Sequence, residues 1–83
     1  MNLNYHQSLI IALSQSIVTR YGAVLSERDL GEIFGLSEVT IRNKFTQGAK
    51  DLPTYTQLKG KRVVMAQDLA EFMVHNELRF YNL

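Results

Sequence analysis

Residues 26–48, SERDLGEIFGLSEVTIRNKFTQG, are the stretch that decides the fold expected of this 83-residue chain. Ser26 and Asp29 have the spacing of a helix capping box, with aspartate in place of the usual glutamate. Gly35 follows the apolar residues of this segment and stands where a C-cap glycine is expected. A short helix is therefore predicted to start after Ser26 and to end at Gly35.

A second helix is predicted to follow after a single intervening residue. Ser37 is suited to be its N-cap, and Gly48 stands where another C-cap glycine is expected. Ile41 and Phe45 lie one helical turn apart, and we expect both to face inward. Two short helices joined by a tight turn over residues 27–47 are the sequence form of a helix-turn-helix, although a plain helical hairpin gives a similar pattern.

The chain around this stretch adds a hairpin and two further helices. Pro53 breaks any helix, and the residues after it are rich in strand formers on both sides of Gly60, which suits a tight turn. The expected elements are an N-terminal helix over 6–21, the helix-turn-helix over 27–47, a wing hairpin over 54–65 and a C-terminal helix over 67–77. We therefore predict one mostly α-helical domain over residues 1–83 with a two-stranded β-hairpin, a winged helix-turn-helix with an extra N-terminal helix.

Composition and motifs exclude several classes of protein. Hydrophobic residues make up 46% of the chain, which suits a globular fold, and the absence of cysteine excludes disulfides and cysteine-rich zinc sites. No apolar run approaches the ~18 residues of a membrane helix, and the start lacks the pattern of a signal peptide. His6 and His75 are isolated, and no phosphate loop or nucleophile motif is present. We expect no membrane contact, no cofactor, no metal and no catalysis.

Charge is distributed unevenly along the chain, although its formal net value is only +1. Between Arg42 and Arg62 there are six basic residues and one acid, Asp51, which gives a balance of +5. The remainder of the chain holds three basic and seven acidic residues, which gives −4. A local positive face of this kind attracts phosphate backbones, and the alternative is an ordinary solvated surface.

The order of these features resembles a known family of small DNA-binding domains. Residues 25–73 look like the winged helix-turn-helix domains of phage excisionases and of AlpA-type and pyocin-activator-type regulators, distant relatives of the MerR DNA-binding domain. The shared features are Gly35-Leu36-Ser37, Thr40-Ile41, Gly48, Leu52-Pro53, the basic turn Gly60-Lys61-Arg62, and Asp68-Leu69 before Phe72. The resemblance implies a sequence-specific DNA-binding regulator or excisionase-like factor, cytoplasmic and nucleoid-associated in a bacterium or a phage-infected cell.

Three features of the sequence depart from the pattern of that family. Residues 49–51 lengthen the link between Gly48 and the Leu-Pro pair. Lys44 stands where an apolar residue is more common, and Glu38 stands where a basic residue is common. The first departure lengthens the connection to the wing, and the other two change the chemistry of the helix that would face DNA.

The second helix of a helix-turn-helix enters the major groove, where its exposed residues meet base edges. The residues expected to contact DNA are Ser37, Glu38, Val39, Thr40, Arg42, Asn43, Lys44 and Thr46 on this helix, and Lys59, Lys61 and Arg62 at the wing tip. Arg42 can pair with guanine and Asn43 with adenine, each through two hydrogen bonds. The basic residues of the wing would reach phosphates or the minor groove, or else protect a strand edge from pairing.

Several of these residues also have a purely structural alternative. Glu38 could accept a hydrogen bond from cytosine, or it could form an ion pair with Arg42 one turn later. Val39 could touch a thymine methyl group or be partly buried. Ser37 and Thr40 suit phosphate contacts, and Ser37 is also an N-cap in either case.

The expected partner is double-stranded DNA, bound by a homodimer or a cooperative assembly, because one recognition helix reads too few base pairs to find a site alone. Apolar residues available for a subunit interface are Leu9, Ile10, Leu13, Ile17 and Val18 near the start, and Leu78, Phe80, Tyr81 and Leu83 in the tail. The alternative is that they pack on each other within one chain. The main alternative function is a protein-interaction module whose basic surface binds or inhibits a protein or nucleoprotein partner.

Overall fold

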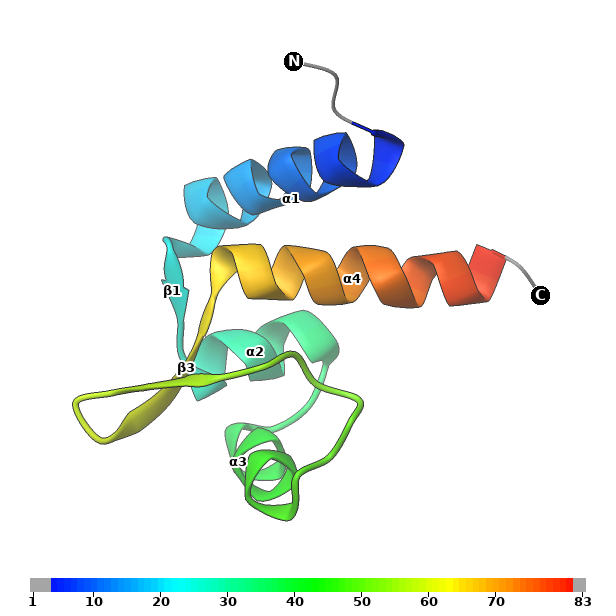
Figure 1. The fold of residues 1–83 in the computed structure, drawn as a ribbon. Helices are drawn as coiled ribbons and strands as arrows, with labels where there is room; N and C mark the ends of the chain where they lie inside the picture. Colours follow the sequence, from blue (N-terminus) through cyan, green and yellow to red (C-terminus); the bar gives the residue numbers. More distant parts are fainter. Residues whose placement is uncertain (1–3, 82–83) are drawn as a thin grey trace.

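The computed structural model describes the backbone of residues 4–81 and the side chains of residues 4–76 (Figure 1). Its helices and strands are, in chain order, α1 (Tyr5–Tyr21), β1 (Val24–Leu25), α2 (Glu27–Phe34), α3 (Glu38–Gln47), β2 (Thr56–Leu58), β3 (Lys61–Met65) and α4 (Ala66–Tyr81). The described residues therefore form a mostly helical structure with a small antiparallel sheet, as the sequence predicts at this coarse level.

α1 packs along α4, and Figure 1 shows this pair above the pair formed by α2 and α3. Asn4 begins α1 with a capping box, because its side chain accepts a hydrogen bond from the Gln7 amide at 2.7 Å. Ile17 is buried, and Ile10 and Leu13 pack against the core. Ile17 is therefore not available for a subunit interface, and the packing of Ile10 and Leu13 follows the alternative, in which the apolar residues pack within one chain.

α2 and α3 are capped as the sequence predicts. The Ser26 hydroxyl and the Asp29 carboxylate each accept a hydrogen bond from the other residue's amide, at 3.1 and 3.0 Å. Gly35 ends α2 in the left-handed region at φ 70°, which glycine adopts without steric cost. Gly31 allows the turn after α2 to pass close to the helix. A Cβ at this position would lie 2.6 Å from the backbone oxygen of Leu36, which is too close for a side chain.

The sheet has three strands where the sequence predicts two. β3 lies in the centre, with β2 on one side and β1 on the other, both antiparallel to it. β1 is two residues long, too short to show the alternation by which a strand is recognised in a sequence. The hairpin strands cover residues 56–58 and 61–65, so the hairpin begins two residues later than the predicted 54 and ends at the predicted 65.

The core draws at least one fully buried side chain from each central element. These residues include Leu25 on β1, Leu30 on α2, Ile41 on α3, Val64 on β3 and Leu69 on α4. Phe45 on α3 is also buried, at 6% exposure, so the predicted inward face of this helix is confirmed. The core thus fixes α3 from its inner side and leaves its outer side open.

α4 begins directly after β3 and extends beyond the predicted 67–77 at both ends. The amide of Ala66 donates a hydrogen bond to the carbonyl of Ala23 at 2.9 Å, which ties the start of α4 to the end of the α1–β1 connection. The apolar tail proposed as an interface, Leu78, Phe80, Tyr81 and Leu83, lies outside the described side chains.

Candidate functional site

The outer side of α3 carries five side chains that the sequence predicts to contact DNA. Glu38, Val39, Arg42, Asn43 and Thr46 are all exposed. Val39 is 57% exposed, so the alternative of partial burial is wrong for this residue. Because Ile41 and Phe45 hold the opposite side in the core, the exposed side is presented with a fixed orientation.

The first turn of α3 is organised by two hydroxyl groups. The Ser37 side chain accepts a hydrogen bond from the Thr40 amide at 3.0 Å, and the two side-chain oxygens lie 2.8 Å apart. Ser37 is therefore the N-cap of α3, which is one of the two roles expected of it. Both hydroxyls stand at the helix N-terminus, where the macrodipole favours an anion.

Arg42 is held by two carboxylates from two different helices. Its Nε donates to Glu27 Oε1 at 3.1 Å, and its Nη2 donates to Glu38 Oε1 at 3.4 Å. The Glu38 contact is the ion pair considered as an alternative in the sequence analysis. The Glu27 contact, from the first residue of α2, was not predicted, because it joins residues that only the tertiary fold brings together.

Lys44 and Asp51 form an ion pair that connects α3 to the following loop. Lys44 Nζ lies 2.7 Å from Asp51 Oδ2, and the Lys44 side chain is 29% exposed. The hydrogen bond from Lys44 lowers the pKa of the Asp51 carboxyl below its ordinary value. Lys44 and the loop of residues 49–51, which are separate features of the sequence, are therefore joined by this ion pair.

Arg62 bridges the hairpin and the C-terminal half of α3. Its Nη1 donates to Thr46 Oγ1 at 3.0 Å and to the Arg42 backbone oxygen at 3.4 Å. Its guanidinium carbon lies 5.4 Å from the centre of the Tyr55 ring, which packs edge-on against Phe45 at 5.0 Å. Arg62, expected at the wing tip, is instead turned toward α3 and ties the hairpin to it.

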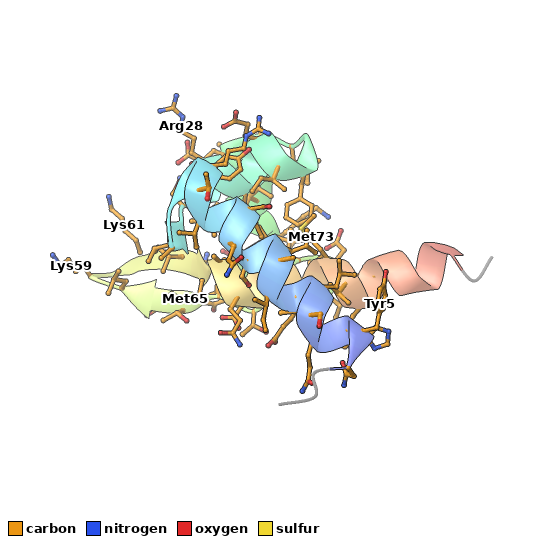
Figure 2. The ribbon with its side chains drawn as sticks, turned by 90° about the horizontal axis from the view of Figure 1, so that it is seen from above. Tyr5, Arg28, Lys59, Lys61, Met65 and Met73 are labelled. Carbon is orange, nitrogen blue, oxygen red and sulfur yellow. The ribbon has the colours of Figure 1, made fainter. Side chains whose placement is uncertain are left out.

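The tip of the hairpin carries two lysines, one on either side of Gly60, and Lys59 points outward from the tip (Figure 2). Lys59 and Lys61 are exposed, and neither forms an ion pair with any residue whose side chain the structure describes. Lys59 has φ 53° and Gly60 has φ 77°, the positive values of a tight two-residue hairpin turn. Lys59 is the only non-glycine residue among those described with a positive φ, so the turn carries a lysine where asparagine or glycine fits best.

A cleft of about 440 Å³ separates the hairpin from the starts of α2 and α3. It is lined by Ser26, Glu27, Glu38, Arg42, Gln57, Gly60, Lys61, Arg62 and Val63. The helix that was expected to read bases and the hairpin that was expected to contact phosphates therefore border one cleft. Two carboxylates, Glu27 and Glu38, line its helical wall together with Arg42, and Lys61 and Arg62 line its hairpin wall.

Neither a metal cluster nor a membrane span is found in the described part of the chain. No three histidine, cysteine, aspartate or glutamate side chains there gather closely enough to hold a metal ion. None of the described helices has both the length and the apolar character needed to cross a bilayer. The chain matches no protein-family model, and no curated protein or solved structure is similar enough to it to count as a match.

Proposed function

We propose that this protein binds double-stranded DNA in a sequence-specific manner, as a winged helix-turn-helix regulator or excisionase-like factor of a phage or mobile element. In this proposal α3 enters the major groove, and the hairpin β2–β3 is the wing that contacts the phosphate backbone. The protein then acts in the cytoplasm, on the nucleoid of its host.

The observation that carries this proposal is the cleft shared by α3 and the hairpin. Arg42 on its helical wall and Lys61 on its hairpin wall face the same space. A duplex bound by α3 would pass close to the hairpin, because Arg62 joins the hairpin to α3 through Thr46. This arrangement lets one helix meet base edges while a neighbouring cationic loop meets the backbone.

The direct test is the binding of the wild-type chain to a labelled duplex of unselected sequence, followed by fluorescence anisotropy. Affinity should fall steeply between about 50 and 200 mM salt, because lysine–phosphate contacts release counterions. The double variant Lys59→Ala/Lys61→Ala should weaken binding and flatten the slope by about two. A wild-type chain that leaves the duplex unbound at low salt would overturn the proposal.

A second candidate function is supported by exposed apolar side chains on α3 and on the hairpin, the two elements that border the cleft. Val39 on α3 is 57% exposed and Leu58 beside the hairpin turn is 50% exposed. Exposed apolar residues beside paired charges suit a protein partner, so the chain could bind or inhibit a protein or nucleoprotein complex through this face. Binding to a partner protein that persists at high salt, without binding to a duplex at low salt, would favour this function.

We further propose that two or more copies act together on DNA, since a single α3 reads only a few base pairs. Ile17 of α1 is buried in the core and is not available for this contact. Ile11 and Val18 on α1 remain 45% exposed and, with Met65, line a groove of about 630 Å³. Light scattering of the free protein, compared with its complex on a duplex, distinguishes a stable dimer from assembly on DNA.

A further inference from the structure

The carboxylates around Arg42 have a consequence for the kind of DNA contact that this residue can make. The guanidinium group has five N–H donors in a rigid plane. Nε and Nη2, which lie along one edge of that plane, donate to Glu27 and Glu38. The terminal edge, formed by Nη1 and the second hydrogen of Nη2, has no acidic partner among the described residues. The pair of donors that matches guanine O6 and N7 is therefore still available.

The same contacts disfavour the use of Arg42 on a phosphate. Swinging the side chain toward the backbone would break both ion pairs, and it would leave Glu27, whose side chain is only 16% exposed, without its cation. An ion left unpaired in a partly buried position loses more free energy than an exposed one. The two carboxylates would also repel a phosphate brought close to them.

We propose that Glu27 and Glu38 orient Arg42 so that it contacts a guanine edge and not the phosphate backbone, which makes them specificity-determining residues. The inference rests on the proposed function, since it assigns roles within the same DNA-binding surface. Arg42 contributes discrimination between sequences, while the lysines of the hairpin tip contribute affinity for any duplex. Glu27 and Glu38 act through Arg42 and need no contact with DNA themselves.

The matched test uses two acids of α2, Glu27 and Glu32. Glu27→Gln and Glu32→Gln remove the same charge from the same helix, but only Glu27 forms an ion pair with Arg42. Binding to an unselected duplex is followed from about 50 to 200 mM salt. Glu27→Gln should tighten this binding and steepen the slope of log K against log salt by up to about one, because Arg42 then keeps only its longer contact with Glu38, at 3.4 Å, and can turn to neutralise a phosphate. Glu32→Gln should change the slope clearly less.

The same two substitutions in an Arg42→Ala chain distinguish the release of Arg42 from a general change in charge or folding. In Arg42→Ala the substitution Glu27→Gln should no longer change the slope beyond the effect of Glu32→Gln, since the residue that it releases is gone. Equal slopes for the two glutamine variants in the wild-type background would overturn the inference and leave the proposed function standing. A wild-type chain that fails to bind the duplex at low salt would overturn the proposed function itself.

Discussion

The two basic parts of the molecule use their charges in opposite ways. Around α3, Arg42 and Lys44 form ion pairs within the protein, and Arg62 donates to Thr46. At the hairpin tip, Lys59 and Lys61 are exposed and have no acidic partner among the described side chains. A cation whose neighbours fix its position is suited to directional hydrogen bonds, and a free cation is suited to neutralising phosphates. Within one surface, the cations around α3 are therefore held in fixed orientations, while the lysines of the hairpin tip supply free positive charge.

The largest expected effect tests whether α3 contributes more to the core than the hairpin does. Phe45→Ala should lower the free energy of unfolding by about 3–5 kcal/mol, since it empties a buried site and removes the ring that packs on Tyr55. Leu58→Ala, at a half-exposed position of the hairpin, should stay within about 0.5 kcal/mol. Chemical denaturation measures both free energies. Equal losses of stability in the two variants would contradict the claim that α3 turns Phe45 into the core.

Two neighbouring cations of β3 provide the next comparison. Arg62→Ala should lower stability by about 1 kcal/mol, because it removes the hydrogen bond to Thr46 and the contact with Tyr55. Lys61→Ala should leave stability within about 0.5 kcal/mol, but it should weaken binding to any duplex and flatten the salt slope by about one. If Lys61→Ala destabilised the fold as much as Arg62→Ala, the two cations would not have separate roles.

Lys59 provides a case in which stability and binding should change in opposite directions. Lys59→Asn should raise stability by up to about 1 kcal/mol, because asparagine followed by glycine is favoured where both residues have positive φ. The same substitution should weaken duplex binding, because it removes a cation from the tip. Thermal melting and anisotropy measure the two effects, and a variant that loses stability would argue against the turn geometry.

The smallest expected effect concerns the ion pair between Lys44 and Asp51. Since the pKa of Asp51 is lowered in the folded chain, its contribution to stability should be present above about pH 4 and should be lost as the pH falls through the folded pKa. The difference in Tm between wild type and Asp51→Asn should therefore be small at neutral pH and should vanish in acid. A difference that does not change with pH would show that the carboxylate charge is not involved.

The features that could be predicted from the sequence are those that short segments determine. Ser26 with Asp29, and Gly35 before Ser37, identify the ends of α2 and α3 from local chemistry alone. Gly60 likewise identifies the hairpin turn. In each case the residues that interact lie within a few positions of one another, so their spacing carries the information.

The features that could not be predicted depend on contacts between distant segments. Glu27 meets Arg42 across 15 positions, and Arg62 meets Thr46 across 16. Nothing in the spacing of these residues indicates a contact, because it depends on how α2, α3 and the hairpin pack. The sequence therefore identified the basic residues of the surface and offered one ion pair, between Glu38 and Arg42, but it gave no sign that Lys44 and Arg62 are also held by the protein.

The central claim is that α3 reads sequence while the hairpin supplies affinity, and selection from a pool of randomised duplexes tests it most directly. Sequencing of the bound fraction should give a motif for the wild-type chain, with a guanine preference that Arg42→Ala loses and an adenine preference that Asn43→Ala loses. Lys61→Ala should recover the same motif at lower yield. A wild-type chain that enriches no motif, or a motif that persists unchanged in Arg42→Ala and Asn43→Ala, would contradict the claim.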